Sequence, residues 1–273
     1  MQAGSIRVIP APIDGNPWKA LLIGDLHIIM KDGVGDRTLA DLDLTINRVL
    51  PEIIRREQPR QIIILGDIFH NVGYQLYHNR DTFFDWANDY VKRLTAICFE
   101  SSPSVQQLIM MGGNHDRVLF YDLADGWNEL RPGHITACKE FFIELTPAKL
   151  PIGKTATRCI LCHNGGHDHQ IGTDRIFDTF HALHKLYGFG EGALLVTAHV
   201  HVYQNWSEHD IEELEPEIRA ERPRIGCIGT LSLNKKNRKV HHYGVLTEST
   251  EMGKFLFKGG SITADDLPKD SEK

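Results

Sequence analysis

The chain has 273 residues, with 30 Lys and Arg against 36 Asp and Glu, so its formal net charge is −6 at pH 7 with neutral histidines. Hydrophobic residues make up 41% and charged residues 24%, a balance that is typical of globular proteins and excludes disordered, collagenous and low-complexity classes. No apolar run approaches the ~18 residues of a membrane span, and the first residues lack a secretory leader pattern. We therefore expect a cytoplasmic protein with no membrane partner.

Cysteine usage and charge exclude two further classes. The 5 cysteines are odd in number and scattered, which is not the pattern of a disulfide framework. A mildly acidic chain is a poor general binder of polyanions, so contact with a nucleic acid would need a local basic patch. A basic cluster at 235–239 is either such a patch or a solvated hairpin tip.

Five short apolar runs predict β-strands that are buried on both faces, because they lack the alternation of polar and apolar residues found in half-exposed strands. In chain order these runs are 20–23, 62–65, 108–111, 159–162 and 194–197. Before them we expect a strand at 6–9, a turn at 14–17 and a second strand from Trp18, as in a hairpin. Further short strands are expected between 224 and 257.

Apolar residues at three- and four-residue spacing predict helices over 39–53, 83–97 and 176–187. Pro51 should kink or end the first of these helices. Strands that alternate with helices indicate an α/β sandwich with a largely buried sheet. We interpret residues 1–260 as one domain that carries an acidic helical insertion at 207–222, followed by a polar tail at 261–273.

Residue types that bind metals follow each of the five apolar runs. In chain order they are Asp25 and His27, Asp67 and His70, Asn114 with His115 and Asp116, His163, and finally His199 and His201. In α/β sheets ligands collect outside the carboxyl ends of the strands, so we expect these side chains to share one rim. The alternative, five unrelated sets of loop residues, explains their recurrence poorly.

The spacing of these residues supports a shared centre. In the patterns D-x-H and H-x-H, residues two apart project to the same side of an extended segment, so each pair can bind one ion. The glycines Gly24, Gly66 and Gly113 let the backbone turn sharply and admit a ligand close by. Oxygen and imidazole ligands without thiolates suit Mn, Fe, Zn or Co and argue against a structural zinc site.

The order D-x-H, G-D, G-N-H-D, a lone His and H-x-H resembles the calcineurin-like metallophosphoesterases over residues 20 to about 247. The resemblance implies an α/β sandwich of two mixed β-sheets flanked by helices, and two divalent metal ions, with Mn favoured. One ion would be held by Asp25, His27, Asp67 and His201. The other would be held by Asp67, Asn114, His163 and His199, so that Asp67 bridges the pair.

The resemblance also implies a mechanism. A hydroxide that bridges the metals would attack phosphorus, and His115 would protonate the leaving group while Asp116 orients it. His70 belongs to a G-D-x-x-H element that is similar to those of the double-strand-break-repair nuclease subunit and of ligase-associated phosphoesterases. In those relatives the extra histidine contacts the substrate phosphate. Arg117 is a further candidate for phosphate contact, as are Lys31 and Arg37, each with an ordinary surface charge as the alternative.

Two departures guide the choice of substrate. Protein phosphatases of the superfamily carry Asp followed by Arg where this chain has His70 and Asn71, which argues against that class. We expect a phosphodiesterase that acts on nucleic acid or nucleotides, with DNA or RNA as substrate and a protein partner or homodimer for a long duplex. Phe69, Tyr74 and Tyr77 are candidates for stacking on a base, with core packing as the alternative.

Other functions remain open from the sequence. A phosphomonoesterase or a cyclic-nucleotide phosphodiesterase would use the same metal-binding residues. An inert interaction scaffold would keep the fold and lose ligands, and all seven predicted ligand positions are occupied by suitable residue types, which disfavours it.

Overall fold

The structure, a computed structural model, describes residues 6–10, 18–32, 34, 37–139, 142–146, 157–163, 182, 184–185, 188, 191–199, 204–206, 216, 224–232, 240–249 and 254–268. The expected helix at 176–187 and the acidic insertion at 207–222 lie outside these ranges apart from isolated positions. The basic cluster at 235–239 and His201 lie outside them entirely.

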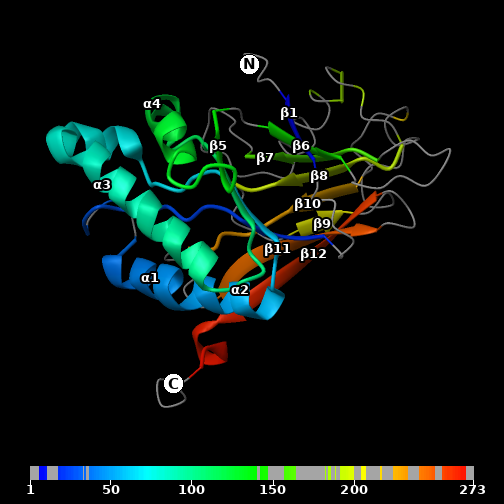
Figure 1. The fold of residues 1–273 in the computed structure, drawn as a ribbon, viewed down its shortest axis with the longest axis horizontal. Helices are drawn as coiled ribbons and strands as arrows, with labels where there is room; N and C mark the ends of the chain where they lie inside the picture. The colour runs from blue at the N-terminus through cyan, green and yellow to red at the C-terminus, as the bar shows by residue number, and fades with distance from the viewer. Residues whose placement is uncertain are drawn as a thin grey trace.

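Two six-stranded sheets form the centre of the described part of the chain (Figure 1). The first sheet has the order β12 (Lys254–Thr263), β11 (Val240–Ser249), β2 (Lys19–Ile23), β3 (Gln61–Leu65), β4 (Gln107–Met111) and β5 (Ile135–Cys138). The second has the order β1 (Ile6–Pro10), β6 (Phe142–Thr146), β7 (Cys159–Cys162), β8 (Leu194–Thr197), β10 (Arg224–Cys227) and β9 (Gln204–Trp206). Both sheets contain parallel and antiparallel pairs. The expected α/β sandwich of two mixed sheets is therefore confirmed.

Helices cover the outer face of the first sheet (Figure 1). They are α1 (Leu39–Leu44), a π-helical turn (Thr45–Val49), α2 (Leu50–Glu57), α3 (Val72–Glu100) and α4 (Arg117–Asn128). A short 3₁₀ helix, Ala264–Asp266, follows β12. Of the helices described, none has both the length and the apolar character that crossing a membrane requires.

The five apolar runs become strands because neighbouring residues of each run enter different cores. In β3, Ile62 and Ile64 pack in the cluster that includes helix residues such as Phe83, whereas Ile63 and Leu65 pack in the cluster between the sheets. Each of these four residues is fully buried. A strand covered on both faces has no solvent-facing side, which explains why the polar alternation is missing. All five predicted strands are confirmed to within one residue.

The expected N-terminal hairpin is wrong. Strand β1 pairs in parallel with β6 in the second sheet, whereas β2 lies between β11 and β3 in the first sheet. The two strands are neighbours in sequence but belong to opposite layers of the sandwich. Strand pairing over more than a hundred residues of sequence decided this, and the local turn pattern carries no information about it.

Of the two outcomes expected for Pro51, a kink or an end of the first helix, the end is wrong. Proline lacks the backbone N–H that an α-helix needs four residues after each carbonyl. A π-helical turn precedes it, in which the backbone N–H of Leu50 bonds to the carbonyl of Thr45. Pro51 then occupies the first turn of α2, where no such N–H is required, and the helix continues to Glu57.

The polar tail begins later than residue 261. Strand β12 extends through Thr263, and Ile262 and Leu267 are 1% and 8% exposed. These two side chains pack in the core that lies under the helices. Isolated apolar residues in a polar stretch therefore anchor the chain beyond the expected boundary at residue 260.

Candidate metal centre

The carboxyl ends of neighbouring strands place the predicted ligands together. Strands β2, β3 and β4 are parallel neighbours, and the residues that follow them supply Asp25, Asp67 and Asn114. Strands β7 and β8 of the second sheet are also parallel neighbours, and they lead to His163 and His199. The centre thus lies where the strand ends of both sheets meet. Six of the seven predicted ligand positions gather there, and the seventh, His201, is not described.

Asp25, His27 and Asp67 form the first cluster. One potential ligand atom from each lies within 4.8 Å of the others. His27 Nε2 is 3.7 Å from Asp25 Oδ1 and 4.0 Å from Asp67 Oδ2. Ligands bind an ion at about 2.0–2.2 Å, so two ligands of the same ion lie roughly 3–4 Å apart. These three atoms are therefore spaced to share one cation.

Asp67, His163 and His199 form the second cluster, again with ligand atoms within 4.8 Å of one another. His163 Nε2 lies 3.2 Å from Asp67 Oδ2 and 2.9 Å from Asn114 Oδ1. The four residues predicted for the second ion are thereby in contact or near contact. Asp67 is common to both clusters, and the same oxygen, Oδ2, faces both histidines.

These residues fit two divalent cations. Asp67 is fully buried, and in the described chain the groups that face its Oδ2 are the ring nitrogens of His163 at 3.2 Å and of His27 at 4.0 Å. A buried carboxylate oxygen is costly unless a positive charge lies beside it. Carboxylate oxygens and imidazole nitrogens are the donors that bind such ions, and a shared carboxylate is suited to a pair of them.

The electrostatics of the second cluster show the same demand for positive charge. Burial raises the pKa of Asp67, but the charge and hydrogen bond of His163, together with the charge and backbone N–H of His115, outweigh burial and lower the pKa to about 2. Burial lowers the pKa of His163, but the charge and hydrogen bond of Asp67, the charge of Asp25 and the hydrogen bond to the Leu65 carbonyl together outweigh burial and raise the pKa to about 10. A metal ion binds only neutral imidazole, so an ion at this position would replace the His163 proton.

Left-handed backbone shapes the ligand loops, contrary to the expected extended geometry. Asp25, His27, Asp67 and His199 have φ values of 54°, 49°, 49° and 78°. Such conformations cost of order 1–3 kcal/mol each in residues other than glycine and persist only where the surroundings enforce them. For Asp25, His27 and Asp67, backbone bonds between the loops after β2 and β3 enforce them, since the N–H of His27 donates to the carbonyl of Asp67 at 2.9 Å and that of Ile28 to the carbonyl of Ile68 at 2.8 Å. The D-x-H pair does converge, through two loops that lie side by side.

Two glycines give the centre its space. Gly66 has a φ of +80°, and a Cβ atom there would lie 2.6 Å from the ring of His163. A Cβ atom on Gly113 would lie 2.1 Å from Asp67 Oδ1. The expectation that glycines admit a close approach is confirmed at these two positions, where what approaches is a ligand side chain.

His115 lies beside the clusters with one ring nitrogen already engaged. Its Nδ1 accepts a hydrogen bond of 3.0 Å from the backbone N–H of Asn71, so the proton of the neutral ring is on Nε2. Its own backbone N–H donates to Asp67 Oδ1 at 2.9 Å. Burial lowers the pKa of His115. The side chain is half-buried, and its Nε2–H is the group it can offer to a ligand.

The carboxylate of Asp116 has a role different from the expected one of orienting His115. Its carboxylate accepts backbone hydrogen bonds from Gly113 at 2.7 Å and from Phe69 at 3.1 Å. It is fully buried, and burial together with the charge of Asp67 raises its pKa to about 7. Asp116 therefore ties the loops after β3 and β4 together, and the backbone of Asn71 orients the His115 ring instead.

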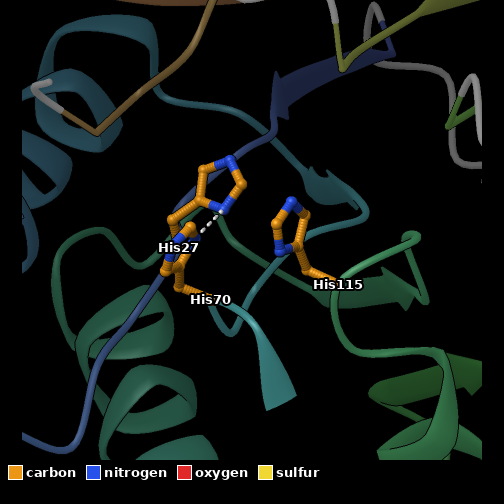
Figure 2. Close-up of side chains that lie close together, drawn as sticks. All are labelled: His27, His70 and His115. Carbon is orange, nitrogen blue, oxygen red and sulfur yellow. Dashed lines mark hydrogen bonds between the residues drawn. The ribbon is translucent and has the colours of Figure 1, made fainter. Parts of the chain in front are cut away.

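His70 lies beside both His27 of the first cluster and His115. Figure 2 shows the three histidines grouped, with a contact of 3.2 Å between the Nδ1 atoms of His70 and His27. The rings of His70 and His115 are stacked, with centroids 4.9 Å apart and planes inclined by 21°. Ring nitrogens of His27, His70 and His115 lie within 4.8 Å of one another.

The three basic candidates differ in their surroundings. The guanidinium of Arg117 donates to the hydroxyl of Tyr121 at 3.1 Å and lies over its ring. Lys31 donates to Asn79 at 3.4 Å on the surface. Arg37 is only 6% exposed, and its charge helps to lower the pKa of His115. The surface-charge interpretation is therefore wrong for Arg37, and no local pattern in the sequence marks its burial.

Gln75 is a residue that the sequence analysis missed. It is 1% exposed in the first turns of α3, accepts from the backbone N–H of Met30 at 2.7 Å, and donates to the carbonyl of His70. It thus joins the loop after β2 to the loop after β3. A glutamine on a helix gives no sequence signal of this kind, because both of its partners are backbone groups.

The sequence model of the family described as calcineurin-like phosphoesterase matches residues 19–228, well over half of the chain, and this range includes every residue of both clusters. A search of curated proteins found no significant match.

Two solved structures are similar to the chain. A dimetal phosphatase from Danio rerio is 12% identical with a TM-score of 0.46, over 91% of this chain and 99% of that one. A predicted phosphoesterase from Streptococcus pneumoniae TIGR4 is 12% identical with a TM-score of 0.35, over 91% of this chain and 100% of that one.

Proposed function

This chain belongs to the calcineurin-like phosphoesterase family, and on that premise we propose that it hydrolyses phosphodiester bonds of nucleic acids or nucleotides with two divalent metal ions. The observation that carries the proposal is the shared carboxylate of Asp67, whose Oδ2 faces His27 on one side and His163 on the other. A second aspartate, Asp25, completes the negative charge on the His27 side.

The two clusters define which residues would hold the ions. Asp25, His27 and Asp67 would bind one ion, with His201 as the expected fourth ligand. Asp67, Asn114, His163 and His199 would bind the other. When bound, such a pair neutralises the charge of a phosphoryl group and activates water as the nucleophile. We favour Mn, with Fe, Zn or Co as alternatives that the same donors accept.

His115 would supply the proton for the leaving group. Its Nδ1 is occupied by the N–H of Asn71, so Nε2 carries the proton of the neutral ring. The ring is half-buried, and burial lowers the pKa of its imidazolium form, so at neutral pH the group that would meet a departing alkoxide is the Nε2–H of the neutral ring. His70, stacked on His115, would donate a hydrogen bond to a phosphate oxygen.

The surroundings of the site favour a diester over a monoester. Two cations neutralise the single negative charge of a diester, so the reaction needs a proton donor more than it needs further positive groups. The position of the phosphate-binding arginine of protein phosphatases is occupied by Asn71, which is the N-cap of α3.

Exposed aromatic side chains nearby favour a nucleotide. Tyr74 and Tyr77 are 44% and 85% exposed, whereas Phe69 is fully buried, so Phe69 is no longer a stacking candidate. The backbone N–H of Tyr74 donates to Asn71, the residue that contacts His115. Tyr74 is thus one helical turn from Asn71, which contacts the proton donor, and a stacked base would add ~1–3 kcal/mol to binding.

The test measures metal content and substrate preference together. We expect the purified protein to bind two ions, and Mn-dependent cleavage to be faster for bis-p-nitrophenyl phosphate and single-stranded DNA or RNA than for p-nitrophenyl phosphate. Cleavage of the monoester alone would overturn the diester proposal, and cleavage of cyclic nucleotides alone would replace the nucleic acid. A protein that binds no ion and cleaves none of these would be the interaction scaffold.

A further inference from the structure

His27 has two ring nitrogens that meet different groups. Its Nε2 faces the carboxylates of Asp25 and Asp67, at 3.7 Å and 4.0 Å. Its Nδ1 lies 3.2 Å from Nδ1 of His70, a contact that Figure 2 shows as a dashed line. The ring is 1% exposed, so neither nitrogen has water as its main partner. One ring therefore offers two separate nitrogens, Nε2 as the atom that can bind a metal ion and Nδ1 as the atom that contacts His70.

A metal ion on Nε2 settles which nitrogen carries the proton. Neutral imidazole has one proton, and a ligand nitrogen has none, so Nδ1 of His27 must be the donor. Histidine ligands give this second N–H to a carboxylate, a carbonyl or water, which sets the orientation and the basicity of the ring. Here the atom that faces it is another imidazole nitrogen.

We infer that His70 is the hydrogen-bond acceptor that orients His27 as a metal ligand, an inference that rests on the metal site of the proposed function. Acceptance at Nδ1 leaves the proton of a neutral His70 on Nε2. The two histidines then form a chain in which His27 Nδ1–H donates to His70 Nδ1, and His70 Nε2–H remains for a phosphate oxygen. His70 is a positioning residue for the metal ligand, in addition to any contact with substrate.

The surroundings hold His70 firmly enough for this role. Its backbone N–H donates to the carbonyl of Ile28 at 2.9 Å, directly beside His27 in sequence. Its carbonyl accepts from Gln75, which also accepts from Met30 at 2.7 Å. Its ring is stacked on His115. The acceptor and the ligand are therefore carried by two loops that are bonded to each other on both sides of the histidine pair.

The contact between His70 and His27 differs from the one that supports His163, the other buried histidine ligand. His163 Nδ1 lies 2.8 Å from the carbonyl oxygen of Leu65, so its supporting group belongs to the backbone of β3. No side-chain substitution removes that carbonyl. The support of His27 is a side chain, so it can be deleted or replaced by another acceptor.

The experiment measures affinity for the ions apart from hydrolysis. The full chain is freed of metal, reloaded with Zn²⁺ and titrated against a chelator of known affinity, and bound metal is counted by mass spectrometry. In His70→Leu we expect one of the two ions to bind about 10–100-fold more weakly, which is the usual effect of removing the hydrogen-bond partner of a histidine that binds a metal. His70→Asn should recover most of that affinity, because the amide oxygen lies near the position of Nδ1 and accepts a hydrogen bond.

His115→Leu is the matched control, because His115 belongs to the same group of rings but its Nδ1 accepts from Asn71. We expect it to bind both ions with the affinity of the wild type. Thermal unfolding without metal checks that the three variants are folded. In the Zn-loaded wild type, long-range proton–nitrogen correlation should show His27 protonated on Nδ1, which tests the inference even where His70→Leu does not fold.

The results separate the inference from the function on which it rests. Wild-type affinity for both ions in His70→Leu, or a His27 proton on Nε2, would overturn the inference and leave the metal site standing. A wild type that binds no ion would overturn both. Three ions in the wild type, with one lost in His70→Leu and also in His115→Leu, would show that the three histidines bind an ion of their own, and the positioning role would be wrong.

Discussion

The floor and the rim of the centre are built differently. We define the floor as the fully or almost fully buried residues Asp25, Asp67 and His163, and the rim as the more exposed His70, Asn114 and His115. Backbone groups support the floor, as where the N–H of His199 donates to Asp25 Oδ2 at 3.0 Å. Side chains and helix starts support the rim. From this difference we expect ion binding to depend most strongly on the floor and turnover to depend on His115 at the rim, while Asn114 and His70 contribute to ion binding from the rim as a ligand and as the support of a ligand.

The largest expected effect comes from the floor. Asp67→Ala removes the carboxylate that both clusters share, so we expect fewer than one bound ion per chain. Hydrolysis should fall by about three orders of magnitude or more, because metal catalysis contributes several kcal/mol. Mass spectrometry of bound metal and rates on bis-p-nitrophenyl phosphate measure the two effects. Asp125→Ala, at an exposed aspartate paired with Lys139, is the control and should retain both ions.

A change at the rim should separate turnover from ion binding. His115→Ala should keep both ions and lose ~10²–10⁴-fold in kcat, the usual contribution of a general acid. The loss should be smaller for a p-nitrophenyl leaving group than for a nucleotide, since nitrophenolate departs without a proton. Loss of an ion in this variant, or equal losses for both leaving groups, would contradict the assignment of His115 as the proton donor.

A smaller effect is expected at Gly66, the backbone position against which the ring of His163 packs. Gly66→Ala places a Cβ atom against the His163 ring at a left-handed position, so it should destabilise the fold by about 1–3 kcal/mol and weaken ion binding. Denaturant unfolding and metal titration test this. Gly73→Ala is the matched control, because its Cβ meets nothing within 4 Å, and it should be neutral or stabilising. Equal stability of the two variants would mean that the ring of His163 can move away from residue 66 without cost.

The smallest effect is expected beyond the rim. Arg117 is engaged with Tyr121, and an exposed contact of this kind contributes ~0–1 kcal/mol. Arg117→Ala should therefore change KM for a dinucleotide by less than about fivefold. Steady-state kinetics measures it. A rise of tenfold or more would show that Arg117 leaves Tyr121 to bind the substrate phosphate, as the sequence analysis proposed.

Much of the fold and the gathering of the site residues could be read from local patterns. The run at 62–65 predicted a strand because burial on both faces demands continuous apolar residues, and β3 confirmed it. The placement of Asp67 directly after it was equally readable, since the residue after a parallel strand must emerge at the carboxyl edge of the sheet.

Other features depended on partners distant in sequence. Strand β1 joined a sheet that excludes β2, Arg37 became buried beside residues near 232, and Asp116 bonded to the backbone of two loops. Each of these contacts depends on the tertiary fold, so a pattern of neighbouring residues does not predict it.

The order of residue types along the chain was therefore enough to predict which side chains would meet, because strands and their edges follow from local apolar patterning. How they meet was settled by packing over long distances. The left-handed φ values of Asp25 and Asp67 and the facing nitrogens of His27 and His70 exist only because two loops are bonded side by side, and that constraint arises when the sheet has formed.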